Sequence, residues 1–148
     1  MILSWLFAAV HLIALGIGLP AVWLRGRALQ GPLDDEALNQ VFRTDSVWGI
    51  AALLWITTGV IRAFSGLEKG SAYYLSNTAF LIKMGLLAIV LLLEVWPMTT
   101  LIGWRVGRSR GQAIDTSQAG KFAIISRIQA FIIVLMVFAA TAMARGLG

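Results

Sequence analysis

The chain of 148 residues contains no cysteine, one histidine and few charged residues. The absence of cysteine excludes disulfides, thiolate nucleophiles, iron–sulfur clusters and zinc sites built from cysteine. The single histidine, His11, excludes a metal site of several histidines unless a second subunit contributes ligands. Charged residues make up 13% of the chain and apolar residues 59%, a balance typical of integral membrane proteins.

Four apolar segments reach the length of about 20 residues that is needed to cross the hydrocarbon core of a bilayer. The N-terminus lacks the basic region of a signal peptide and its apolar run is too long for one, so we expect it to remain as the first span. The connections of about 12–20 residues favour antiparallel neighbours. The sequence therefore predicts a single all-α domain, residues 1–148, in which four transmembrane helices form an up-down-up-down bundle, with spans at 2–24, 45–64, 78–101 and 122–144.

The net charge of +5 would suggest nucleic acid as a partner of a soluble protein. Here the basic residues gather in the first and third connections, whereas the second connection holds only Lys69. The positive-inside rule explains this asymmetry without nucleic acid. We expect a multi-pass protein of the bacterial inner membrane with both termini outside the cytoplasm. The basic residues of the two predicted cytoplasmic connections are Arg25, Arg27, Arg43, Arg105, Arg108, Arg110 and Lys121.

The third apolar segment carries two charged residues, Lys83 and Glu94, on one helical face. A charge inside the bilayer costs about 2.5–3.5 kcal/mol on insertion scales, so each needs a partner or a function. Glu94 and Arg127 fall at similar depth, which predicts a structural ion pair between the third and fourth spans. The alternatives are that Arg127 pairs with Asp45, faces lipid headgroups or binds a ligand.

The outer half of the predicted bundle collects His11, Arg62, Lys83 and Met136 at similar depth. A histidine in a membrane helix beside small residues can ligate haem iron, with the two basic residues holding propionates and Met136, Met143 or Met84 as a second axial ligand. The plainer interpretation is that His11 bonds to another helix and that Met136 only packs.

Three runs of the chain are Val41-Phe-Arg-Thr-Asp-Ser-Val-Trp-Gly49, Gly66-Leu-Glu-Lys-Gly-Ser-Ala-Tyr-Tyr74 and Ala139-Ala-Thr-Ala-Met-Ala-Arg-Gly146. With these runs the chain resembles a family of small bacterial predicted membrane proteins without assigned function. The resemblance covers nearly the whole chain.

A more distant similarity joins Ala9-Val-His-Leu-Ile13 and Phe80-Leu-Ile-Lys-Met-Gly-Leu86 to the J-type protoporphyrinogen IX oxidase, a four-helix membrane protein associated with b-type haem. Copper-resistance protein D is similar in layout. The resemblance implies that His11 is the haem ligand or essential histidine and that Lys83 is the charge near the porphyrin, which makes both catalytic candidates. The Tyr/His-rich region that follows the first helix of the oxidase is replaced here by the shorter segment 25–43.

These observations favour an oxidoreductase that binds haem b or a porphyrin-like ligand in an outer-half cavity, with quinone or oxygen as electron acceptor. The alternative is a non-catalytic protein: an oligomeric membrane scaffold, an assembly factor or a subunit of a small-solute permease. The small residues on the helix faces suit contacts within a homo-oligomer. A proton path from His11 and Lys83 to Glu94 is disfavoured because Leu87 and Val90 lie between them.

Overall fold

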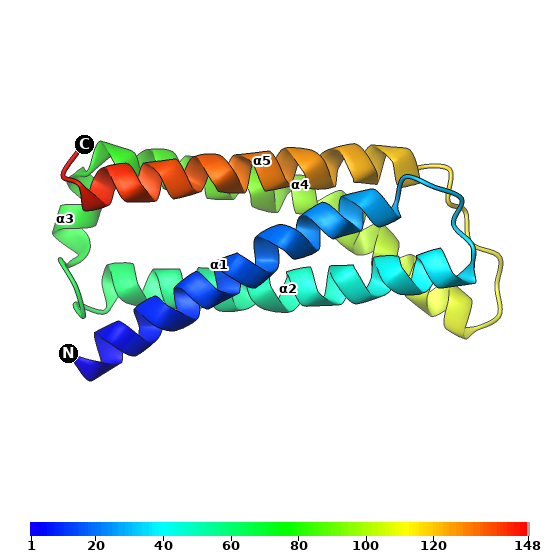
Figure 1. Cartoon of the computed structure of the whole chain (residues 1–148), viewed down its shortest axis with the longest axis horizontal. Helices are drawn as coiled ribbons and strands as arrows, with labels where there is room; N and C mark the ends of the chain where they lie inside the picture. The colour runs from blue at the N-terminus through cyan, green and yellow to red at the C-terminus, as the bar shows by residue number, and fades with distance from the viewer. Residues whose placement is uncertain (148) are drawn as a thin grey trace.

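The computed structural model describes residues 1–147, which form five helices and no strand (Figure 1). Four of these helices are long and apolar enough to cross a membrane. This confirms the predicted all-α membrane fold with four spans. The short fifth helix lies in the second connection. The helices are α1 (Ile2–Ala28), α2 (Asp35–Phe64), α3 (Ser71–Ser76), α4 (Thr78–Ser109) and α5 (Ala119–Ala144).

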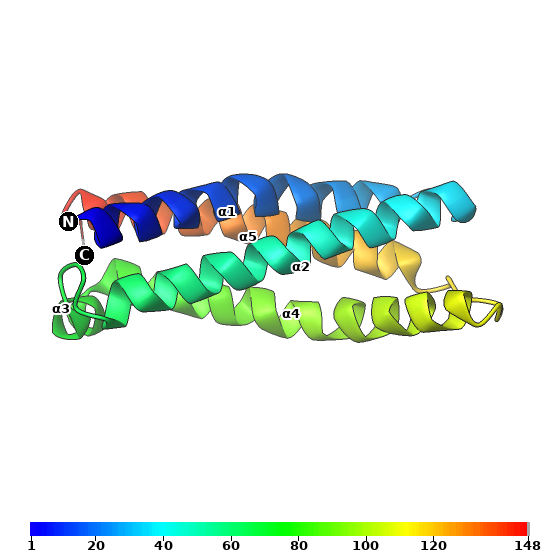
Figure 2. The same cartoon turned by 90° about the horizontal axis from the view of Figure 1, so that it is seen from below.

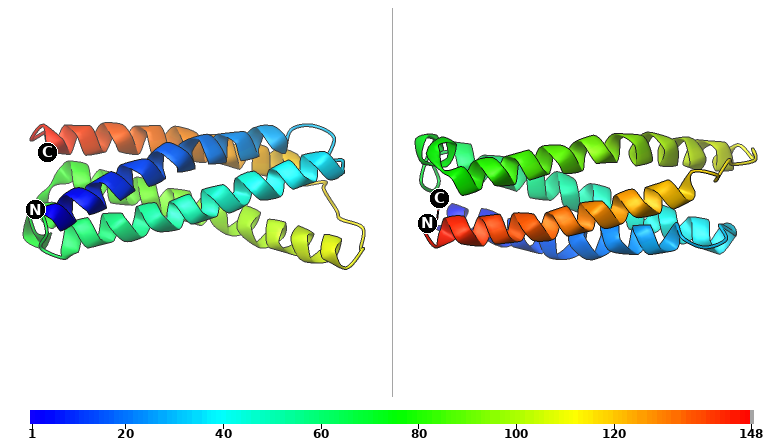
Figure 3. Two further views of the ribbon diagram at one scale, coloured as in Figure 1. Left: turned by 60° about the horizontal axis from the view of Figure 1, so that its bottom comes forward. Right: turned by 90° about the horizontal axis from the view of Figure 1, so that it is seen from above.

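The long helices alternate in direction, as Figures 2 and 3 show from further sides. Both termini and α3 lie at one end of the bundle, here called the α3 end (Figure 1). The connections 29–34 and 110–118 lie at the other end, here called the arginine end. The helix α1 packs between α2 and α5, and α5 also packs against α4.

All four long helices extend beyond the predicted spans, each of them toward the arginine end. The predicted spans leave residues 25–44 as a polar connection, and this is wrong, because α1 continues to Ala28 and α2 begins at Asp35. The Asp34 side chain accepts a hydrogen bond from the backbone N of Ala37 at 2.8 Å and caps α2. Leu38 and Val41 are buried, so this first part of α2 joins the core instead of forming a loop.

The helix α1 lies close to α5 at the arginine end and diverges from it toward the α3 end (Figure 1). Glycine makes the close approach possible. A Cβ on Gly26 would lie 3.1 Å from Ser126 Cβ and 3.2 Å from the Ala123 carbonyl oxygen of α5. Further along α1, a Cβ on Gly18 would lie 3.3 Å from Ala51 Cβ of α2. Such small residues let membrane helices pack backbone to backbone.

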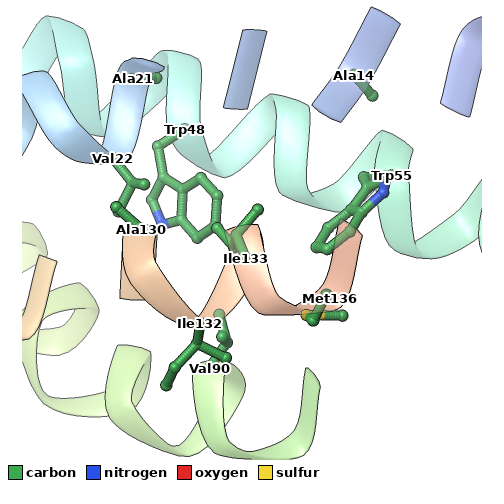
Figure 4. Close-up of a cluster of buried hydrophobic side chains, with 10 residues drawn as sticks. All are labelled: Ala14, Ala21, Val22, Trp48, Trp55, Val90, Ala130, Ile132, Ile133 and Met136. Carbon is green, nitrogen blue, oxygen red and sulfur yellow. The ribbon is translucent and has the colours of Figure 1, made fainter. Parts of the chain in front are cut away.

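The middle of the bundle is an apolar cluster to which all four long helices contribute (Figure 4). Its large members are Trp48 and Trp55 of α2, and Ile133 and Met136 of α5 are each only 1% exposed. This packed layer separates the two ends of the bundle. Polar side chains inside the bundle form two separate groups, one toward the arginine end and one toward the α3 end.

Two arginines of α4 link it to α2 at the arginine end. Arg105 Nη2 donates to Asp45 Oδ2 and to the Phe42 carbonyl oxygen, both at 2.8 Å. Arg108 Nη1 donates to Asn39 Oδ1 at 2.8 Å. Toward the α3 end a small apolar cavity lies between α2 and α4 instead.

Candidate functional site

A cavity of about 460 Å³ occupies the α3 end of the bundle, where α1 and α5 diverge. Its volume lies in the range of small-molecule sites. His11, Arg62, Lys83 and Met136 all line it, so the structure brings together the four residues singled out from the sequence. The remaining wall is mostly apolar or small and comes from α1, α5 and the segment around α3: Ala8, Leu12, Leu15, Val137, Ala140, Ala144, Tyr73 and Tyr74.

His11 is held by α2 through one ring nitrogen. Its Nδ1 lies 2.9 Å from the Trp55 carbonyl oxygen and 3.0 Å from Thr58 Oγ1. A carbonyl oxygen only accepts, so Nδ1 carries a proton and donates. In the neutral ring Nε2 therefore has a free lone pair, and no hydrogen bond to Nε2 is found within residues 1–147. The second nitrogen is available to a ligand in the cavity.

A glycine makes room for the imidazole. A Cβ on Gly59 of α2 would lie 3.0 Å from His11 Cε1, closer than side chains normally approach. Beside it is a smaller chamber of about 60 Å³ between α2 and α4, walled mainly by apolar side chains such as Val60 and Phe80. His11, Trp55, Lys83 and Met136 line both spaces, so the imidazole stands between them.

The three cations of the cavity, Arg62, Lys69 and Lys83, differ in their partners. Arg62 Nε donates to Glu68 Oε1 at 2.6 Å, and the Tyr74 hydroxyl donates to Glu68 Oε2 at 2.7 Å. Lys83 is half-buried, and within residues 1–147 it makes no hydrogen bond or ion pair with a side chain or carbonyl. The positive charges that remain for a ligand are therefore on Lys83 and on Lys69, whose Nζ donates only to the neutral Tyr73 hydroxyl at 3.1 Å, whereas that of Arg62 is neutralised.

The Arg62, Glu68 and Tyr74 contacts tie the second connection to the rim of the cavity. Burial favours a raised pKa for Glu68, but the hydrogen bonds from Arg62 and Tyr74 outweigh it and hold the pKa of Glu68 below its ordinary value. Burial, together with the neighbouring Glu68 carboxylate, raises the pKa of Tyr74 to about 12. The carboxylate and the phenol therefore keep this arrangement at neutral pH.

Trp55 contributes a second unused polar group. It stacks on His11 with ring centroids 5.8 Å apart and lines both spaces. Its indole Nε1 is buried and has no acceptor in the part of the chain that the structure describes. Buried donors without a partner are rare. This N–H is therefore an unsatisfied donor in a residue that lines the cavity.

A second polar site lies across the apolar cluster, toward the arginine end, and is built around Arg25. The Arg25 side chain is fully buried and makes five contacts, one for each N–H of a guanidinium. It donates from Nε to Ser126 Oγ (3.0 Å), from Nη1 to Asp45 Oδ1 (2.9 Å) and Glu94 Oε1 (2.7 Å), and from Nη2 to Glu94 Oε2 (2.9 Å) and Gln129 Oε1 (2.9 Å). The network joins α1, α2, α4 and α5.

The predicted pair of Glu94 with Arg127 is wrong. Glu94 forms a bidentate pair with Arg25, and Gln129 Nε2 donates to its Oε2 at 2.8 Å. Arg127 is exposed on α5 and donates from Nη2 to Gln30 Oε1 at 2.6 Å. The physical reason is that α1 does not end at Leu24 but continues to Ala28, which places Arg25 between α4 and α5.

The helical spacing of Arg25 from His11 indicates that Arg25 faces inward, but ending the predicted first span at residue 24 excluded Arg25 from the helix. Arg25 follows His11 by 14 residues, which at about 100° each is within roughly 40° of four full turns. His11, Ala14 and Gly18 are buried on the same stripe of α1. Arg25 therefore continues an inward face and does not belong to a polar connection.

The described residues 1–147 contain no group of three or more His, Cys, Asp or Glu side chains that could hold a metal ion. A metal at His11 would thus need most of its ligands from another source. A porphyrin supplies four such ligands in a plane and needs only axial ones from the protein.

The comparisons with known proteins identify a family. No curated protein and no solved structure matches the chain, so its similarity to the J-type oxidase and to copper-resistance protein D stands on the quoted residues alone. A family model described as predicted membrane protein (DUF2214) matches residues 3–148. With this match over nearly its whole length and four membrane-spanning helices, the chain belongs to the DUF2214 family of predicted membrane proteins.

Proposed function

We propose that this membrane protein binds haem b or a closely related porphyrin in the cavity at the α3 end, with His11 Nε2 as the axial ligand. The observation that carries the proposal is the orientation of His11, whose Nδ1 is bound to the Trp55 carbonyl while Nε2 is left without a partner. Metal-ligating histidines typically donate their other ring N–H in this way, which fixes the tautomer and raises the basicity of the ligating nitrogen.

The other lining residues fit the same ligand. The half-buried Lys83, with no acidic partner of its own, would hold a propionate carboxylate. Ala8, Leu12 and Leu15 of α1 and Val137, Ala140 and Ala144 of α5 line the cavity, and these side chains would give a flat molecule apolar contacts from both helices. Arg62 lies at the rim, where release from Glu68 would free it for a second carboxylate.

A bound haem would supply one-electron redox chemistry, and an oxidoreductase role follows, with quinone or oxygen as acceptor. The protein would orient the ligand through His11, neutralise it through Lys83 and keep water out through the apolar wall. In such a low-dielectric site the Lys83 charge acts on a bound carboxylate far more strongly than it would in water.

The test is an absorption spectrum of the purified protein after expression with added haem precursor, both oxidised and reduced with dithionite. We expect a Soret band and sharp reduced α and β bands that disappear in His11→Ala. Lys83→Met should keep the Soret band but weaken haem affinity about tenfold, because one charge-assisted contact to a carboxylate is lost. Arg27→Gln, which is far from the cavity, serves as the control and should bind as the wild type does.

Met136 decides the coordination of the iron. If Met136 is the second axial ligand, the substitution Met136→Leu should convert a six-coordinate low-spin spectrum into a five-coordinate high-spin one. An unchanged spectrum would leave His11 as the protein's single ligand. A featureless spectrum of the wild type at saturating haem would contradict the proposal as a whole and favour the oligomeric scaffold or permease subunit.

A further inference from the structure

A second hollow lies on the outer surface between α1 and α5, toward the arginine end and away from the haem cavity. Its volume is about 340 Å³, and it is lined by Leu19, Pro20, Trp23, Ala130, Phe131 and Val134, with Arg127 as its one charged member. The Trp23, Phe131 and Val134 side chains are between 38% and 64% exposed, so the groove faces the surroundings of the bundle. In a membrane-spanning protein those surroundings are lipid.

Arg127 brings an uncompensated charge to this groove. It has no carboxylate partner within residues 1–147, where its one side-chain hydrogen bond goes to the neutral Gln30. Its guanidinium carbon lies 6.0 Å from the centre of the Trp23 ring, and both residues line the groove. A guanidinium has five N–H groups. Most of these donors are therefore unused and lie beside an apolar channel.

We propose that this groove binds one anionic phospholipid of the surrounding bilayer, with its phosphate on Arg127 and one acyl chain along the groove. Charge complementarity selects this occupant, because a buried or lipid-facing cation needs an anion and the bilayer carries phosphates at this level. The planar fork of arginine suits two phosphate oxygens at once. Trp23 is the kind of residue that anchors at the membrane interface.

The chain contains a matched control. Arg27 is an exposed arginine near the same end of α1, two residues beyond the buried Arg25, and it does not line the groove. Arg127→Gln and Arg27→Gln therefore remove the same charge from the same end of the molecule. Non-specific attraction to anionic lipid falls equally in both, whereas a built site is lost in only one.

The experiment is native mass spectrometry of the full chain in detergent, titrated separately with phosphatidylglycerol and phosphatidylcholine. We expect the wild type to retain one phosphatidylglycerol in preference to phosphatidylcholine. Arg127→Gln should weaken retention about fivefold, and Arg27→Gln should change it less than twofold. Val134→Trp, which fills the groove but keeps Arg127, should also lose the lipid.

Three outcomes would overturn the proposal. Equal losses in the two arginine variants would mean general charge attraction. Unchanged retention in Val134→Trp would mean that no acyl chain lies in the groove. A dimer that is broken by Arg127→Gln and is indifferent to lipid would mean that a second copy of the chain covers the groove. None of these depends on haem, so the lipid site and the haem site stand or fall separately.

Discussion

The His11 ring is fixed from two sides by α2. Trp55 and Thr58 hold Nδ1, and the bare backbone at Gly59 leaves space for the Cε1 edge of the ring. Each of these neighbours constrains where Nε2 points. A change at one of them should act on a bound ligand through the position of His11, without touching the ligand itself.

Gly59→Ala tests this constraint. The added Cβ would lie 3.0 Å from His11 Cε1, so the ring has to move away from its place beside the cavity. We expect haem affinity to fall about 10–100-fold, the usual cost of disturbing a group that orients a metal ligand. The measurement is a haem titration followed at the Soret band.

Gly49→Ala is the matched control, because Gly49 lies on the same helix with nothing within 4 Å of the added atom. It should leave haem affinity unchanged and stabilise α2 by up to about 1 kcal/mol through helix propensity. Equal haem affinities in the two variants would show that the position of the ring does not matter.

At the scale of elements, the C-terminal turn of α1 links the four long helices through Arg25. Arg25 contacts one side chain of α2, one of α4 and two of α5, and every contact has hydrogen-bond geometry. The α1 helix has no other charged side chain in its buried stripe. The relative placement of the four helices at the arginine end therefore depends on one guanidinium.

Arg25→Leu should destabilise the fold by about 3–5 kcal/mol, because it leaves the half-buried Glu94 next to Gln129 without a cation. Arg127→Leu should cost under about 1 kcal/mol, since Arg127 is exposed and has no acidic partner in residues 1–147. Reversible unfolding in mixed micelles measures both. A larger loss in Arg127→Leu than in Arg25→Leu would restore the pairing first expected from the sequence.

The second connection, residues 65–77, caps the cavity at the α3 end, and the contacts of Glu68 that fasten this cap to α2 depend on pH. The pKa of Glu68 is lowered in the fold, so its bonds to Arg62 and Tyr74 stabilise the cap above the ordinary carboxyl pKa of 4.5 and are lost as the pH falls through the lowered value. The pKa of Tyr74 is raised, so its contribution is complete below 10.0 and is lost as the pH rises toward about 12.

A spin label on Ala72→Cys, at an exposed position of α3, would report this hold. We expect an immobile label from about pH 5 to pH 9 and a mobile one at both extremes. In Glu68→Gln the label should be more mobile at every pH. The reason is that the lost ion pair, which is partly exposed, stabilises the docked segment by about 0.2–1 kcal/mol. Equal mobility in the two proteins would show that the ion pair does not fasten the cap.

At the scale of the whole molecule, length and hydropathy were enough to predict the four spans and their alternation. Helix ends were harder, because the start of α2 depends on the Asp34 cap and on the burial of Leu38 and Val41. The partner of Glu94 could not be read from depth alone. It lies 69 residues away, and its position depends on where α1 stops. Depth placed His11 and Lys83 at a similar level, but the sequence does not fix the order of the helices around the bundle, so only the structure shows that both line one cavity.

The orientation of the bundle in the membrane is a prediction of the same scale. The basic connections favour placing the arginine end in the cytoplasm and the α3 end outside. The chain contains no cysteine, so single cysteines can be placed without background. We expect Ala72→Cys to react with a membrane-impermeant maleimide in intact cells and Ala113→Cys to react only after lysis. The reverse pattern would invert the topology.

The Arg25 network also has a consequence for how the protein is made. A ribosome delivers α1 to the membrane long before α4 and α5 exist, so Arg25 at first has neither Glu94 nor Gln129 to bind. Asp45 of α2 is the first of its partners to arrive, and the N–H groups that it leaves free must reach the headgroups from the end of α1. Closing the bundle therefore means drawing that arginine from the membrane surface inward as the last helix arrives. A nascent chain arrested before α5 would still expose the end of α1, as labelling of Gly26→Cys could show.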